Sequence, residues 1–119
     1  EDFIPTLRVD SLIESGDVDF GLFESIERLA PFGAGNPRPV FALRKAQPTR
    51  FRTIGDGSHL EVHLPKGAGS LRGIGFGMAE KVPSLDQPVD VAFQLKENWW
   101  RGKRSLELNL KDIAKPDKA

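Results

Sequence analysis

The sequence VDVAFQLKENWWRGKRSLELNL, residues 89–110, places two alternating runs on either side of one glycine. In residues 89–95 and 106–110, apolar side chains recur at every second position, which is the pattern of strands that bury one face. Gly102 lies between the runs and is a typical turn residue of a hairpin. The stretch therefore predicts two antiparallel strands joined by a hairpin loop at residues 97–104.

Three further strands are expected before this hairpin. The first covers residues 40–53, where Pro48 forces a bulge or a bend. The second and third cover residues 58–64 and 70–77, and residues 78–82 fit one helical turn after them. Five strands with a single helical link predict a mainly β fold, a five-stranded barrel on the plan of the oligonucleotide-binding fold (OB-fold).

An acidic segment is expected to precede the barrel. The predicted parts are a linker segment at 1–37, the barrel at 38–115 and a frayed tail at 116–119. Alternation predicts a short strand at residues 6–10, and Asp19 is placed to cap a helix over about 19–29. Apolar residues recur in this helix at three-residue spacing and should face the core. They are Phe20, Phe23, Ile26 and Leu29.

The stretch LAPFGAGNPRPVF, residues 29–41, should form a rigid connector from the helix into the first strand. Its first proline ends the helix, and its two glycines permit backbone angles closed to other residues. No Lys-Ser or Lys-Thr pair follows the glycines, so a phosphate-binding loop is not expected. The residues assigned to this junction are Gly33, Gly35, Asn36, Pro37 and Pro39.

Charge is unevenly distributed along a chain whose formal net charge is zero. Residues 1–30 hold eight acidic and two basic side chains, whereas residues 31–119 hold nine acidic and fifteen basic ones. A basic body can attract phosphates, although charge alone favours an ordinary solvated surface. Cysteine is absent, which fits a reducing compartment and predicts a cytoplasmic location.

The two ends and the hydropathy point to a piece of a longer chain that does not enter a membrane. No apolar run approaches the length of a membrane span. The start is acidic, contains a proline and lacks an initiating methionine, so a signal peptide is not expected.

Catalytic and metal sites are not expected in these residues. His59 and His63 fall on one face of the second strand, opposite Leu60, and without a third ligand they make a poor metal site. A hydrogen-bonded or solvated face is the favoured interpretation. Nucleophile elbows, zinc motifs, P-loops and Asp-His clusters are all missing, so no catalytic residue, metal or cofactor is predicted.

The sequence WWRGKR, residues 99–104, is the strongest candidate for binding a ligand. Aromatic rings beside cations suit single-stranded nucleic acid, because rings stack on bases while cations meet phosphates. In OB-folds this loop and the one at 54–58 border the binding groove. The alternative is that at least one tryptophan packs on the barrel, and we expect this packing. The predicted nucleic-acid-binding residues are Arg50, Arg52, Arg72, Trp99, Trp100, Arg101, Lys103 and Arg104.

Four stretches in this order resemble the C-terminal region of RecJ-type single-strand-specific exonucleases. They are LAPFGAGNPRPVF, HLEVHL, GIGFGM and VDVAFQLKENWWRGKRSLELNLKDI, and the resemblance covers residues 19–113. In that family a Gly-Asn-Pro-x-Pro-Val-Phe segment leads from the nuclease core into an OB barrel. The resemblance implies that the junction fixes where the barrel sits relative to the nuclease channel.

The same resemblance implies a non-catalytic domain that binds single-stranded DNA within a 5′-to-3′ exonuclease of DNA repair and recombination. The family's Asp-His-His metal centre and Gly-Gly-His lobe lie upstream, so Mn²⁺ or Mg²⁺ is expected in the catalytic core and not here. Implied partners are single-stranded DNA, the catalytic lobes of the parent chain and a single-strand-binding protein.

Two points stay open in this interpretation. The family commonly has one tryptophan before the glycine turn, which Trp100 matches, so Trp100 has the structural role and Trp99 is the freer ring. The alternative function is a structural barrel that braces the nuclease lobes or docks a partner without binding DNA. The acidic residues 1–30 favour this alternative, because they repel DNA.

Overall fold

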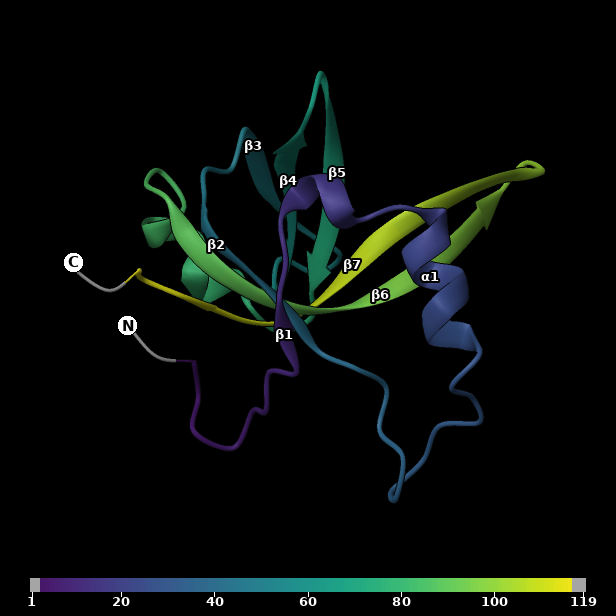
Figure 1. The fold of residues 1–119 in the computed structure, drawn as a ribbon. Coiled ribbons are helices and arrows are strands. Elements are labelled where there is room, and N and C mark those ends of the chain that lie inside the picture. The colour runs from purple at the N-terminus through teal and green to yellow at the C-terminus, as the bar shows by residue number, and fades with distance from the viewer. Residues whose placement is uncertain (1–2, 117–119) are drawn as a thin grey trace.

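The computed structural model describes residues 3–116, and its fold is built almost entirely from strands (Figure 1). None of the helices in this range is long and apolar enough to span a membrane. The strands are β1 (Ser11–Leu12), β2 (Phe41–Ala46), β3 (Arg50–Ile54), β4 (His59–Lys66), β5 (Gly69–Gly75), β6 (Val89–Trp100) and β7 (Lys103–Ala114). The helices are η1 (Ser15–Asp17), α1 (Phe20–Glu27) and η2 (Ala79–Ser84), of which η1 and η2 are 3-10 helices.

The sheet closes on itself into a barrel. Its strand order is β1-β2-β6-β7-β5-β4-β3, and the parallel pair β5–β7 joins the two antiparallel parts. Only three residues around Pro48 separate β2 from β3, so these two are halves of one bent strand. The strand predicted at 40–53 is therefore two strands with the expected bend between them. Counted this way, the barrel has the five strands and the helical link of the predicted OB-fold, with β1 added at one edge.

The core is formed by the inward-facing residues of the barrel strands. Leu60, Val62 and Leu64 are fully buried along β4, as the alternation predicted. Phe93 and Leu95 do the same on β6, and Phe93 lies 6.1 Å from the ring of Phe41. Burial of these side chains supplies the main driving force for closure, at roughly 1.5–3 kcal/mol for each large one.

The β6–β7 hairpin is longer than the sequence indicated, and the predicted loop at 97–104 is wrong. Pairing continues to Trp100 and Lys103, and only Arg101 and Gly102 form the turn, with φ of 51° and 76°. Two positive φ values in a two-residue turn match the right-handed twist of paired strands. The error arose because residues 96–105 are mostly polar, since this part of the hairpin extends beyond the barrel (Figure 1).

The segment before α1 also differs from prediction. The strand expected at 6–10 is wrong, because the paired residues are Ser11 and Leu12, which run parallel to β2. Asp10 fixes this start: its backbone N–H donates to Val40 O at 2.8 Å, and its carboxylate accepts from Val40 N–H at 2.9 Å. The observed strand has only two residues, both exposed, so the alternation at residues 6–10 did not mark it.

Helix α1 begins where predicted and ends two residues early. Asp19 caps it by accepting from Leu22 N–H at 2.8 Å. Phe23 and Ile26 are buried as expected, whereas Phe20 and Leu29 are exposed. A three-residue spacing drifts around a helix of 3.6 residues per turn, so Phe20 leaves the buried face, whereas Leu29 lies beyond the end of the helix.

The junction is held by hydrogen bonds and not by special glycine angles. Gly33 and Gly35 lie outside the left-handed region, and nothing would crowd a side chain at either, so that expectation is wrong. Asn36 instead donates from Nδ2 to Leu29 O at 2.8 Å and to Pro31 O at 2.9 Å. Backbone bonds run both ways between Gly33 and Asn36. The amide of Asn36 thus ties the end of α1 to the entry into the barrel.

Candidate nucleic-acid interface

Both tryptophans lie at the hairpin tip, defined here as residues 99–103, and both are exposed. Trp99 is 61% and Trp100 65% exposed, so the expectation that at least one packs on the barrel is wrong, and so is the packed, structural role expected for Trp100. Adjacent strand residues point to opposite faces, which separates the two rings. Trp99 donates from Nε1 to Glu97 Oε1 at 3.0 Å, and the guanidinium of Arg101 lies 4.5 Å from the centre of the Trp100 ring. The Arg101 guanidinium thus covers one face of the Trp100 ring, and the ring remains exposed on its other side.

Arg104 serves a different purpose from its neighbours. Its guanidinium lies 4.2 Å from the centre of the Phe20 ring and bonds Glu24 of α1 and Glu97 of β6. The hydrogen bond to Glu97, with a further contribution from Glu24, raises the pKa of Arg104, and the same bond lowers the pKa of Glu97. Arg104 fastens α1 to the hairpin, so its position does not support the predicted role in DNA binding.

The three remaining arginines lie together on the outer face, meaning the core-averted surface of β3, β4, β5 and β7. Arg50 pairs with His63 and Arg52 with Glu61 across β3 and β4. Arg72 on β5 lies opposite His63 and, on its other side, opposite Glu107 of β7. The outer face carries Arg50, Arg52, Glu61, His63, Arg72 and Glu107. Arg50 and Arg52 do point the same way, as alternation predicted.

The sequence did not reveal that carboxylates neutralise part of this face. Glu61 accepts from Nε of Arg52 and from Nε of Arg72, both at 2.7 Å, and Arg72 also bonds Glu107. Glu61 is buried, and these bonds, above all the one from Arg52, lower its pKa to about 2. The result is a ladder of alternating charges, with three cations set against two carboxylates.

Arg52 keeps much of its donor capacity. Its side chain is 69% exposed, and within the described residues only its Nε takes part in a hydrogen bond. Arg72 is engaged through two of its nitrogens, and Arg50 makes one long contact of 3.4 Å to His63. Arg52, and Arg50, which pairs with no carboxylate among the described residues, are therefore the residues of this face best placed to meet an added anion.

The histidines form a hydrogen-bonded surface, as predicted. His59 accepts from Gly77 N–H at Nδ1 over 2.9 Å, and His63 lies 3.7 Å from Glu61. Across residues 3–116, no group of three or more His, Asp or Glu side chains is arranged to hold a metal ion. These residues do not fit a divalent metal.

Phe76 is a candidate that sequence reasoning missed. It follows β5 directly, is 63% exposed, and meets His59 edge to face with ring centres 5.4 Å apart. Its contact with His59, whose side chain shares the outer face with Glu61 and His63, places the Phe76 ring on that face. Phe76 lies in the turn after β5, so strand alternation did not indicate it.

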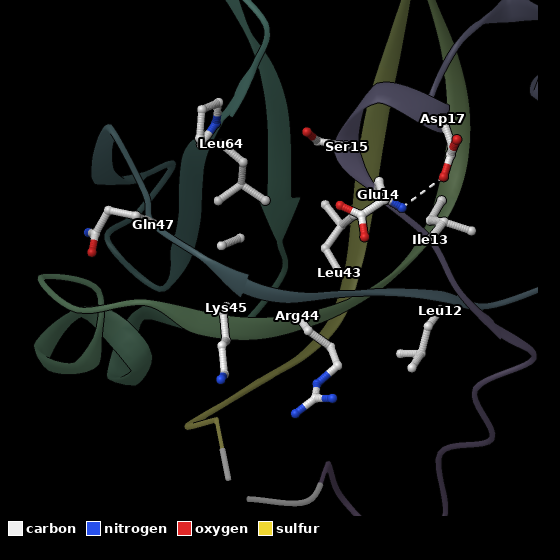
Figure 2. Close-up of a pocket in the computed structure, with 12 residues that line it drawn as sticks. Leu12, Ile13, Glu14, Ser15, Asp17, Leu43, Arg44, Lys45, Gln47 and Leu64 are labelled. Atoms are coloured by element: carbon white, nitrogen blue, oxygen red, sulfur yellow. Dashed lines mark hydrogen bonds between the residues drawn. The ribbon is translucent and has the colours of Figure 1, made fainter. Parts of the chain in front are cut away.

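A cavity of about 640 Å³ lies between η1 and β2 (Figure 2). Leu43 and Leu64 form its apolar wall. Glu14 and Asp17 bring acidic groups from the start and end of η1, and Arg44 and Lys45 bring basic groups from β2. None of the predicted nucleic-acid-binding residues lines it. Two cations and two carboxylates leave this rim without the positive surplus that attracts phosphates.

Comparison with known proteins connects this barrel with RecJ. The RecJ OB domain family model matches residues 9–112. The single-stranded-DNA-specific exonuclease RecJ of Thermus thermophilus is 38% identical over 98 residues, covering 81% of this chain and 13% of that protein. The RecJ of Bacillus subtilis is 26% identical over 117 residues, covering 96% of this chain and 15% of that protein.

Solved structures show the same relationship. RecJ of Thermus thermophilus in complex with Mn²⁺ superimposes with a TM-score of 0.71 at 32% identity, covering 92% of this chain and 16% of that one. Its complex with Mg²⁺ gives 0.65 at 35% identity, covering 82% and 15%. The chain thus spans less than a fifth of the length of the relatives it matches. From its barrel topology and these matches, the chain belongs to the RecJ OB domain family.

Proposed function

We propose that this chain is the non-catalytic, single-stranded-DNA-binding domain of a RecJ-like 5′-to-3′ exonuclease and holds DNA at the nuclease channel. The observation that carries the proposal is the exposed Trp100–Arg101 pair at the hairpin tip. An indole face can stack on any base, and an adjacent guanidinium can donate hydrogen bonds to a phosphate. This pair therefore suits a single strand of any sequence.

The hairpin tip adds further groups of the same kind. Trp99 offers a second exposed ring, and Lys103 pairs with Trp100 across the turn. Base stacking on an aromatic side chain is worth about 1–3 kcal/mol. Each stacked ring would therefore contribute a large share of the free energy of a weak complex. No sequence preference is expected, because every base has a face that can stack.

The outer face supplies a modest cationic surplus. Arg52 retains free donors, whereas Arg72 is largely occupied by Glu61 and Glu107. Phosphates must then compete with carboxylates that are already in place. This arrangement supports weak, salt-sensitive binding, because carboxylates already neutralise part of the positive charge.

Catalysis belongs, in this proposal, to the remainder of the parent chain. RecJ of Thermus thermophilus has been crystallised with Mn²⁺ and with Mg²⁺. We place such a metal in the parent's catalytic core, because the described residues offer no fitting cluster. The junction held by Asn36 would orient the barrel against the catalytic lobes. Single-stranded DNA and those lobes are the proposed partners, in the cytoplasm, and a single-strand-binding protein remains a prediction.

A second function, bracing the nuclease lobes without binding DNA, is favoured by one observation. Leu12 and Leu29 are exposed on the acidic N-terminal segment. Apolar side chains on a segment that repels DNA suit contact with protein. This function and DNA binding can coexist, because they use different surfaces.

The test is fluorescence anisotropy of a labelled single-stranded oligonucleotide at low and moderate salt. We expect saturable binding that weakens with salt, and a loss of about fivefold or more in Trp100→Ala and in Arg101→Ala. Arg8→Ala is the matched control, because the Arg8 side chain is 91% exposed and makes one loose contact, 3.7 Å to Asp10. Absence of binding at low salt and high protein concentration would refute the DNA-binding function and leave the bracing one.

A further inference from the structure

We propose that the edge of β2 at residues 43–46, beside the cavity under η1, docks an extended segment of a partner protein, which adds to the sheet as a further strand. The inference goes beyond the proposed functions, because its ligand is a separate protein and neither DNA nor the nuclease lobes. It uses a surface that none of the predicted nucleic-acid-binding residues lines.

The edge is open because β2 outlasts its neighbour. Within the described residues, β1 pairs with β2 only at Ser11 and Leu12. One more backbone bond follows, from Ile13 N–H to Ala42 O at 3.0 Å, and the chain then turns away into η1. β2 continues to Ala46 and pairs with β6 along its other edge. The place beside residues 43–46 is therefore free for a strand.

Arg44 directs its backbone toward this open edge. Val40 O accepts from Asp10 N–H, and Ala42 O accepts from Ile13 N–H, so both carbonyls point toward the N-terminal segment. Backbone groups alternate in direction along a strand, which gives Arg44 the same direction as Ala42. An extended polypeptide is the ligand that offers a donor and an acceptor to such an edge at strand spacing.

A β-bulge places two cations on one side of the edge. The register of β2 with β6 shifts between Leu43 and Ala46, and Lys45 has a φ of 52°. The Lys45 N–H donates to the carboxylate of Asp90 at 2.9 Å, which holds the bulge. Bulges redirect side chains, and Figure 2 shows Arg44 and Lys45 both pointing away from η1.

The cavity side of the edge is acidic and partly apolar. Glu14 and Asp17 border the cavity of about 640 Å³, and Ile13 and Ala46 line it as half-buried apolar residues. Successive side chains of an added strand would face the two sides in turn. Its complement is a segment in which acidic residues, facing the two cations, alternate with apolar or basic residues that face the cavity.

The charged rim favours a separate, reversible partner. Obligate interfaces are mostly hydrophobic, whereas reversible ones keep a polar rim around a smaller apolar centre. Glu14, Asp17, Arg44 and Lys45 are all exposed and surround the apolar part of the cavity. We therefore assign the edge to a protein that binds and leaves.

The test is fluorescence anisotropy with a labelled heptapeptide of sequence KEVEVEK, which has the alternation described above. This peptide should bind saturably. Its rearranged control KKVVEEE has the same composition without the alternation and should bind at least about fivefold more weakly. N-methylation of the two valines and of the three glutamates, in separate peptides, should abolish binding in one case and spare it in the other, because alternate N–H groups of an added strand face β2.

Variants of Arg44 separate the backbone from the side chain. Arg44→Pro removes the N–H that faces the open edge, a position where a strand tolerates proline, and should weaken binding of KEVEVEK by about fivefold or more. Arg44→Ala keeps that N–H and should weaken it by only about twofold, through the lost charge. Arg8→Ala should change nothing. The peptide series needs no variant, so it decides the question even where Arg44→Pro does not fold.

Hydrogen exchange locates the bound peptide and identifies other occupants. Exchange of the Arg44 amide should slow by about tenfold or more with saturating KEVEVEK. Unchanged exchange, equal affinity for KKVVEEE, or no saturable binding at about 1 mM peptide would overturn the inference. Slow exchange in the parent protein alone would overturn it in favour of the nuclease lobes, and slowing that grows with the concentration of this chain in favour of a second copy.

Discussion

Glu61 shows how a single buried carboxylate organises an arginine-rich surface. It accepts hydrogen bonds from Arg52 and Arg72, which lie on the two neighbouring strands. Alternation along β3 predicted that Arg50 and Arg52 share a face, but it gave no sign of their partners. Glu61 and Glu107 are brought to the arginines by pairing between distant strands, which no local pattern encodes.

The lowered pKa of Glu61 gives a stability prediction with a definite sign. Its pKa falls from 4.5 to about 2 on folding, so its contribution is complete above about pH 4.5 and is lost as the pH falls through 2. Glu61→Gln should destabilise the chain on the order of 1 kcal/mol at pH 7, since solvent around exposed Arg52 screens the pair. Urea unfolding of both proteins from pH 7 to pH 2.5 measures this. A difference that stays constant over the range would contradict the assignment.

Arg104 stabilises the fold, whereas Arg101, three residues away, contributes little to stability, and this contrast is testable. Arg104 bonds Glu24 and Glu97 and covers Phe20, whereas Arg101 projects from the turn over Trp100. Arg104→Ala should lower the free energy of unfolding and increase hydrogen exchange in α1. Arg101→Ala should change stability by less than about 0.5 kcal/mol. Equal effects of the two variants on stability would show that Arg104 does not fasten α1.

At the scale of elements, the sequence predicted the hairpin but underestimated the length of its two strands. Strand alternation identified both of its strands, and Gly102 marked its turn. Its outer half is exposed on both faces, so the contrast between buried and solvated positions, on which alternation depends, disappears there. For the same reason Trp99 and Trp100 were assigned to a loop, although cross-strand pairing holds them both.

Arg101 adopts a backbone conformation in the turn that arginine rarely takes. Its φ is 51°, and a two-residue turn with both φ values positive favours Asn followed by Gly. Arg101→Asn should therefore stabilise the hairpin by about 0.5–1 kcal/mol and weaken DNA binding by about fivefold. Thermal unfolding and anisotropy on the same samples measure both effects. Unchanged DNA affinity in the more stable variant would count against Arg101 as a DNA contact.

At the scale of the whole molecule, the barrel was predictable because five strands and one helical link leave few ways to close a small sheet. The closing contact, the parallel pairing of Arg72 with Glu107 and its neighbours, follows from that topology. Asn36, which was among the residues assigned to the junction, holds it through hydrogen bonds, whereas the glycine angles expected at Gly33 and Gly35 are absent. Proline-rich and glycine-rich patterns mark such a connector but do not show which atoms hold it.

The distribution of charge over the molecule predicts the salt dependence of the proposed DNA binding. The outer face has three cations and two carboxylates, and Arg101 and Lys103 at the hairpin tip add two cations, which together leave about two to four phosphate contacts. For single strands this predicts a slope of log affinity against log salt of about −1.4 to −2.8. Anisotropy titrations across a series of potassium chloride concentrations measure the slope. A slope near zero, or one steeper than about −5, would be inconsistent with this surface.

The most direct test of the central claim uses the indoles as reporters. The chain has two tryptophans, so Trp99→Phe leaves Trp100 as its one fluorophore. Titration of this variant with single-stranded DNA should quench the Trp100 emission in a saturable and salt-sensitive way, because a stacked base quenches the ring it covers. DNA binding seen by anisotropy without any change in the emission of Trp100 would contradict the claim that the hairpin tip holds the strand.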